Sequence, residues 1–134
     1  MTELKPKKTK TKKIAVWGTQ ILLAALFALA ALGKLSRNPQ WISRFRGYGY
    51  SAGFCVLIGA LEAAGALGLL IPRIAGYAAT GLLGIMSGAL YTHLVNGEAP
   101  QVWRPLIFMV LLAIVISYRR PWPLKQLSQI VVEG

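Results

Sequence analysis

Residues 53–71 read "GFCVLIGALEAAGALGLLI", a long apolar run in which Glu62 carries the only charge. A helix of about 20 apolar residues spans the ~30 Å hydrocarbon core of a bilayer. A lone carboxylate near the centre of such a helix is costly to place, so it indicates a partner, a cavity or a working site. The segment therefore predicts a transmembrane helix whose central carboxylate, that of Glu62, has either a structural or a functional role.

The rest of the chain repeats this apolar pattern. Of its 134 residues, 55% are hydrophobic and 14% are charged, whereas about a quarter of the residues in a typical soluble domain are charged. Apolar runs of roughly 17–22 residues, each long enough to span a bilayer, occupy 14–33, 53–71, 74–95 and 102–118. The sequence predicts an all-α fold, a four-transmembrane-helix bundle over residues 14–118, with a basic tail at 1–13 and an amphipathic tail at 119–134.

The basic residues decide the orientation that we expect, because they are retained on the cytoplasmic side during insertion. With four spans, both termini share one side with the turn at 72–73. Ten of the 15 lysines and arginines fall on that side. We therefore expect a multi-pass protein of the inner (plasma) membrane with both termini and both tails in the cytoplasm. Since the net charge of +11 flanks membrane spans, it favours contact with anionic lipids, and we expect no nucleic-acid partner.

The connection between the first two spans, "SRNPQWISRFRGYGYSAG", predicts a short interfacial helix. Asn38 suits the N-cap and Pro39 the first helical position, and the glycines of "GYGY" end the helix. Trp41 and Phe45 then share one face, with Arg44 on another. We expect this helix to lie on the lipid headgroups, and a lid over the bundle is the alternative.

Small residues recur every four positions in the second and third spans. Close packing of helices in lipid needs such residues, because they let the backbones approach. We expect the two stripes to make the second and third spans the tight centre of the bundle, and the bulky last span to meet lipid or a partner subunit. The stripes are Ala60, Ala64 and Gly68 in the second span, and Gly76, Thr80, Gly84, Gly88 and Thr92 in the third.

Two polar residues are candidate partners for Glu62. Lys34 ends the first span and His93 lies near the end of the third, so both enter the bundle from the same side. We expect Lys34, Glu62 and His93 to form a polar pocket. Such a pocket either holds the helices together or lies on a path for a substrate or proton, and the sequence leaves both open.

Several familiar chemistries are excluded by counting residues. Cys55 is the only cysteine, so the chain alone cannot run a thiol–disulfide exchange cycle. His93 is the only histidine, which excludes a bis-histidine haem within one chain. Glu62 and His93 are too few ligands for a metal site. We expect no metal and no intrinsic cofactor, and we assign no catalytic residue.

Three short motifs resemble those of the DoxX family of small four-helix membrane proteins. They are "ALGKL" at 31–35, "LEAAGALGLLIPR" at 61–73 and "SGALYTHLVNGE" at 87–98. The resemblance covers roughly residues 14–118, and Lys34 and His93 match its polar pattern together with Glu62. The family has no agreed catalytic residues to carry over.

The resemblance implies a membrane component of a redox system, since relatives resemble subunits of thiosulfate:quinone oxidoreduction or of oxidative-stress complexes. The first hypothesis is that the protein binds a quinone or another small apolar molecule near Glu62 and acts with a partner that carries the redox centre. The second is a non-catalytic accessory subunit of a larger membrane complex, and the third is a small transporter. The expected partners are membrane lipids and either other subunits or a second copy of the chain.

Overall fold

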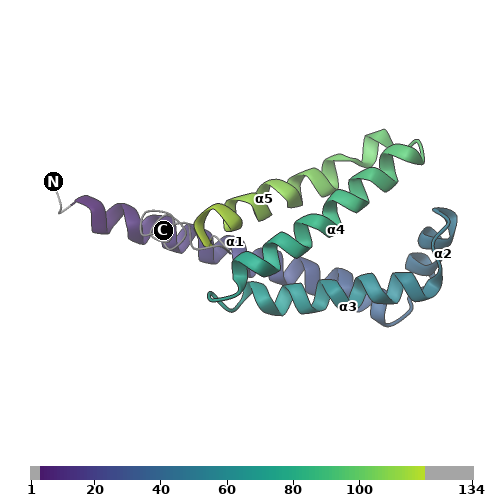
Figure 1. Ribbon diagram of the computed structural model, residues 1–134, viewed down its shortest axis with the longest axis horizontal. Helices are drawn as coiled ribbons and strands as arrows, with labels where there is room; N and C mark the ends of the chain where they lie inside the picture. The colour runs from purple at the N-terminus through teal and green to yellow at the C-terminus, as the bar shows by residue number, and fades with distance from the viewer. Residues whose placement is uncertain (1–3, 120–134) are drawn as a thin grey trace, which may run out of the picture.

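The computed structural model describes residues 4–119, and all of the tail predicted at 119–134 except its first residue lies outside this range. No strand occurs among the described residues, and four helices are long and apolar enough to cross a membrane, which confirms the predicted fold class (Figure 1). The elements are α1 (Leu4–Leu35), α2 (Pro39–Gly47), α3 (Ala52–Leu69), α4 (Ala75–Val95), the 3-10 helix η1 (Ala99–Gln101) and α5 (Trp103–Arg119).

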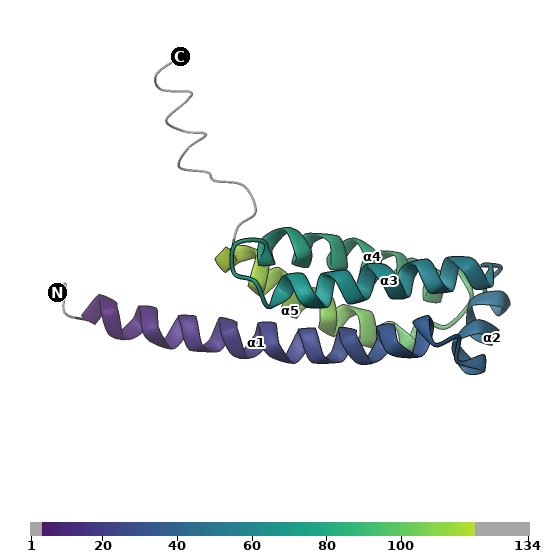
Figure 2. The same cartoon turned by 90° about the horizontal axis from the view of Figure 1, so that it is seen from below.

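Helix α1 is longer than a membrane span requires. Its 32 residues extend about 48 Å at ~1.5 Å per residue, and the candidate span within it begins at Lys10. The basic segment predicted as a tail therefore continues α1 as helix from Leu4, and it projects beyond the other helices (Figure 2). Lysine loses little rotamer freedom in a helix, and Pro6 lies close enough to the start of α1 to be tolerated.

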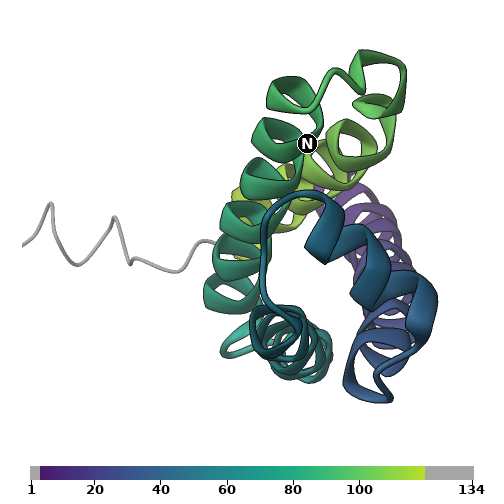
Figure 3. The same cartoon turned by 90° about the vertical axis from the view of Figure 1, so that its right-hand side faces the viewer.

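Helix α2 forms where its capping signals predict it. The Asn38 side chain accepts a hydrogen bond of 3.0 Å from the backbone N–H of Gln40, and Pro39 is the first helical residue. After the helix, Gly49 has φ of +92°, a conformation that glycine adopts without steric cost. The helix lies across one end of the bundle (Figure 3).

The four long helices are arranged as two antiparallel pairs. Helix α1 packs along α3 and α4 packs along α5, while α3 and α4 touch less extensively. The pairs diverge toward the end of the bundle that carries α2 (Figure 1). Where they converge, a core of buried side chains joins them, with Phe27 and Phe108 at a ring distance of 5.2 Å.

The predicted small-residue stripes do not form the tight centre of the bundle. Ala60, Ala64 and Thr80 face outward, and a Cβ added at Gly84 or Gly88 would meet nothing within 4 Å. Three stripe members are buried, namely Gly68, Gly76 and Thr92. Helices α3 and α4 approach closely near their connecting turn, where a Cβ at Gly68 would lie 2.7 Å from the Ala78 Cβ. The expectation that the two stripes pack against each other along the whole length of α3 and α4 is therefore wrong.

The most extensive packing of α3 is against α1, and it uses a different face of the helix. A Cβ added at Gly59 would lie 2.7 Å from the Lys34 Cβ and 3.3 Å from the Ala31 carbonyl oxygen. Glu62 and Ala66 follow on the same buried face. The physical reason is the carboxylate: a charged group cannot face hydrocarbon without a partner, so the face that carries Glu62 turns inward against α1.

We predict that Gly59→Leu destabilises the protein while Gly84→Leu does not. The larger side chain at Gly59 collides with α1, and overpacking of this kind costs about 1–3 kcal/mol. The same change at Gly84 enters open space and should alter stability by no more than about 0.5 kcal/mol. Thermal unfolding of both variants in detergent checks the difference. Equal losses at the two positions would contradict the packing described.

Candidate functional site

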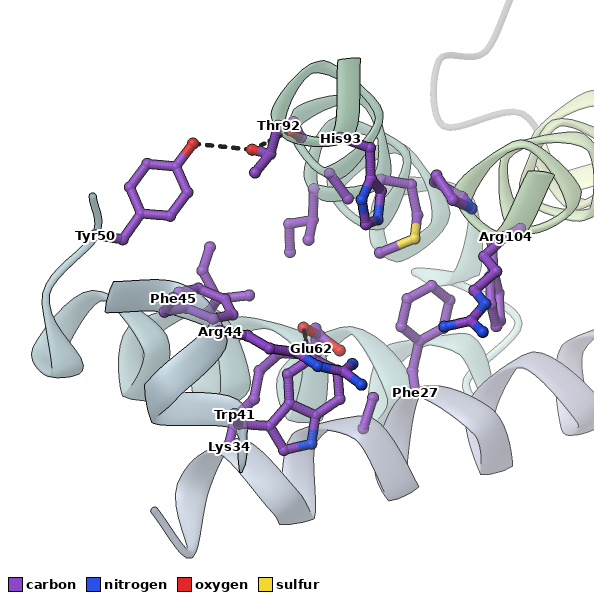
Figure 4. Close-up of a pocket in the computed structure, with 18 of the residues that line it drawn as sticks. Phe27, Lys34, Trp41, Arg44, Phe45, Tyr50, Glu62, Thr92, His93 and Arg104 are labelled. Carbon is purple, nitrogen blue, oxygen red and sulfur yellow. Dashed lines mark hydrogen bonds and ion pairs between the residues drawn. The ribbon is translucent and has the colours of Figure 1, made fainter. Parts of the chain in front are cut away.

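A cavity of about 610 Å³ lies between the diverging helix pairs (Figure 4). Its lining comes from all five α-helices, and its volume is within the ~300–1,000 Å³ that small-molecule sites usually have. Apolar and aromatic side chains make most of the wall, with a few polar groups among them. This is the composition of a ligand site rather than of a water channel.

A buried ion pair lies in the wall of this cavity. Lys34 Nζ is 2.7 Å from Glu62 Oε1, and the two side chains are only 7% and 1% exposed. The ammonium group also lies 4.1 Å from the centre of the Trp41 ring. The pair joins α1 to α3 next to Gly59, so the close approach of the helices and the ion pair support each other.

The second carboxylate oxygen of Glu62 is buried and has no hydrogen-bond partner. A carboxylate oxygen has acceptor capacity for more than one bond, and a buried polar atom left unpaired costs about 1–3 kcal/mol. Because Glu62 lines the cavity, a hydroxyl or amide group of a bound molecule would satisfy Oε2. The cavity therefore offers a hydrogen-bond acceptor within an apolar wall.

Helix α4 supplies a smooth wall opposite this group. Gly81, Gly84 and Gly88 line the cavity, and a Cβ on any of them would meet nothing within 4 Å. Phe27 and Phe108 line it from α1 and α5. Because these three positions of α4 carry no side chain, a flat or elongated apolar molecule has room to lie against the helix backbone there.

Helix α2 covers the wide end of the cavity. Trp41, Arg44 and Phe45 of α2 line it, as does Tyr48 just after the helix, so α2 forms a lid over the cavity, the alternative that the sequence left open. Trp41 packs directly on Gly33, where an added Cβ would lie 2.6 Å from the indole Nε1. The absence of a side chain at Gly33 thus lets α2 fold back over the bundle.

Hydrogen bonds tie the segment after α2 to the end of α4 and to the turn that follows it. The Tyr48 hydroxyl donates to Glu98 Oε1 over 2.8 Å, and His93 Nδ1 lies 2.8 Å from the same oxygen. The Tyr50 and Thr92 hydroxyl groups are 2.9 Å apart. The bonds from His93 and then from Tyr48 hold the pKa of Glu98 below its ordinary value. Burial, followed by the bond to Glu98, raises the pKa of Tyr48.

Lys34, Glu62 and His93 all line the cavity, with His93 on α4 opposite the other two, and the structure does not join all three. Lys34 contacts Glu62, whereas His93 pairs with Glu98. The reason is local: Gly97, with φ of +72°, turns the chain so that the carboxylate of Glu98 returns to the histidine five residues before it.

Two arginines of the cavity were not identified from the sequence. Arg44 and Arg104 line it from α2 and α5. The sequence feature that could have identified them is a nearby tryptophan, since Trp41 precedes Arg44 by one helical turn and Trp103 is next to Arg104. Among residues 4–119, no three His, Cys, Asp or Glu side chains are grouped so that they could hold a metal ion.

The opposite end of the bundle holds a second buried polar contact. Gln20 donates from Nε2 to the carbonyl oxygen of Leu69 over 2.6 Å, and its Oε1 accepts a bond of 2.9 Å from Arg119 Nε. These bonds connect α1, α3 and α5 where the helix pairs converge. They secure the closed end of the structure, whereas the ion pair lies toward the open end.

Comparison with known protein families finds one match that covers most of the chain. Residues 18–115 match the model of the DoxX-like family. This range includes the ion pair, the glycine wall and the lid. Neither a curated protein nor a solved structure matches the chain.

We predict that Glu62→Leu lowers the free energy of unfolding by about 3 kcal/mol, because it leaves the Lys34 ammonium buried without its partner. Adding Lys34→Met removes that charge, so the double variant should return to within about 1 kcal/mol of the wild type. Unfolding in mixed detergent micelles gives the free energy of unfolding of the wild type, of Glu62→Leu and of the double variant. A double variant less stable than Glu62→Leu would show that the two side chains do not act as a pair.

We predict that the lid contact weakens in acid. The lowered pKa of Glu98 means that its ionised form stabilises the folded state. This contribution is complete above the ordinary value of 4.5 and is lost as the pH falls through the lowered pKa. Thermal unfolding between about pH 3 and 6 should show the loss in the wild type and not in Glu98→Gln.

His93→Gln is the matched control for this measurement. It removes the bond that lowers the pKa of Glu98 most, so the acid-induced loss of stability should shift toward the ordinary value of 4.5. Identical acid profiles for the wild type and Glu98→Gln would exclude Glu98 as the titrating group.

Proposed function

Since the chain belongs to the DoxX-like family, we propose that this multi-pass membrane protein is a component of a redox system. Its cavity binds a quinone or another small, mostly apolar molecule beside Glu62. A partner protein carries the redox centre, and membrane lipids cover the outward faces of the helices. The observation that carries this proposal is the unpartnered Oε2 of Glu62 in an apolar cavity.

The residues of the cavity fit a ring that carries oxygen substituents. A quinone, when bound, supplies reversible transfer of electrons coupled to protons. Glu62 Oε2 would accept a hydrogen bond from the reduced form of the ring, while Lys34 holds Oε1 and so fixes the orientation of the carboxylate. Gly84 leaves space for a flat molecule, which a Cβ would fill.

The chain also supplies the conditions that such a site needs. Phe27 and Phe108 give an apolar surface at the narrow end, where aromatic rings contribute area and defined geometry. Helix α2 covers the wide end, where Tyr48 fastens it to Glu98.

The distribution of basic residues supports an orientation for this function. The end of the bundle that carries the lysine-rich start of α1 would face the cytoplasm from the inner membrane. The cavity and α2 would then lie toward the opposite side. Reporter fusions at Gly134 and Gly97 should read opposite sides, with Gly134 cytoplasmic. Both fusions reading the same side would exclude this arrangement.

Binding of a short-chain quinone to the purified protein tests the ligand proposal. We predict saturable binding by the wild type and at least about tenfold weaker binding by Gly84→Leu, because the leucine fills the cavity and removes about 1.4 kcal/mol or more of binding free energy. Gly18→Leu is the matched control. A Cβ at Gly18 also meets nothing within 4 Å, and Gly18 does not line the cavity.

Titration of each protein in a neutral detergent, followed by isothermal calorimetry, gives the dissociation constants. Quinone binding that is absent from the wild type, or equal in Gly84→Leu and Gly18→Leu, would rule out the cavity as the quinone site.

A further inference from the structure

The charges around the cavity do not cancel. Lys34 and Glu62 compensate each other in one ion pair. Arg44 and Arg104 also line the cavity, and no carboxylate within the described range forms a salt bridge with either. Glu98 is near enough to Arg44 to interact with it electrostatically, but its Oε1 is already bonded to Tyr48 and His93.

Both arginines are held in place without being neutralised. The Arg44 guanidinium lies 5.4 Å from the centre of the Trp41 ring, and that of Arg104 lies 5.5 Å from the centre of the Trp103 ring. A cation–π contact of this length orients a guanidinium group but leaves its positive charge and its N–H donors available. The two side chains enter the cavity from α2 and α5 (Figure 4).

We propose that the cavity takes an anionic amphiphile with a single apolar chain. Its acidic group lies between Arg44 and Arg104, and its chain runs along the glycine wall of α4 toward Phe27 and Phe108. The inference rests on the proposed function only in that both treat the cavity as a ligand site. It differs in the ligand, which is an anionic amphiphile instead of a neutral quinone.

The chemistry of each part of the cavity supports this assignment. Guanidinium groups bind carboxylates and phosphates with paired, charge-assisted hydrogen bonds. Both arginines are exposed residues, so their N–H donors are accessible to a ligand. A volume of about 610 Å³ suits one molecule of drug-like size. A neutral quinone would use the walls and Glu62 but would leave both arginines uncompensated.

The test compares dodecanoate with its methyl ester, which has the same chain and no charge. Calorimetric titration of the purified full-length protein in a neutral detergent should give at least about tenfold tighter binding for the acid, the effect of one net charge-assisted hydrogen bond. Arg44→Gln/Arg104→Gln should lose this preference. Arg44→Lys/Arg104→Lys should retain part of it, because the charges remain while the paired donors are lost.

Arg46→Gln/Arg73→Gln is the matched control, since it lowers the net charge equally at two exposed residues that do not line the cavity. This control should bind dodecanoate like the wild type. Size-exclusion profiles that match the wild type establish that each variant is folded. A loss of preference in the control as large as in the Arg44/Arg104 variant would overturn the proposal, because it would show a general charge effect.

The outcome also separates this inference from the quinone proposal. If the acid and the ester bind the wild type equally, the anionic ligand is excluded, while quinone binding that depends on Gly84 still stands. If dodecanoate binds through the two arginines and the quinone does not bind, the quinone is excluded and the anionic ligand stands. Failure of every ligand to bind would overturn both proposals.

Discussion

The requirement that Glu62 be paired inside an apolar membrane domain determines how this protein is packed. One oxygen of the carboxylate meets Lys34, and this contact fixes the rotation of α3 about its own axis. Gly59 then faces α1 closely enough that no side chain could fit between them. On α4, by contrast, Gly81, Gly84 and Gly88 make no close contact with α3 and line the cavity instead.

The sequence predicted the features that depend on local signals. Apolar length identified the four spans, and Asn38 with Pro39 identified α2. It could not predict which face of α3 is buried, because small residues occur on more than one face. In lipid, moreover, the outward side of a helix is as apolar as the inward side, so the usual contrast that marks a buried face is absent.

The same limit explains which residues of the site were missed. Lys34, Glu62 and His93 are conspicuous as polar residues within or beside apolar runs. Arg44 and Arg104, by contrast, lie near helix ends, where basic residues are common in membrane proteins. Their role depends on the divergence of the two helix pairs and on the folding of α2 across the gap, and both are tertiary features that no local pattern encodes.

Because α1 is continuous, the rotation of the bundle about the membrane normal is fixed relative to the lysine-rich start of this helix. Helix α1 runs unbroken from its lysine-rich start to Lys34. Lys12 and Lys34 are separated by roughly six helical turns and differ by only about 40° around the axis. The side of α1 that presents Lys12 beyond the apolar region is therefore nearly the side that presents Lys34 to α3. An acidic surface that binds Lys12 would therefore also fix the direction, within the plane of the membrane, toward which the cavity opens.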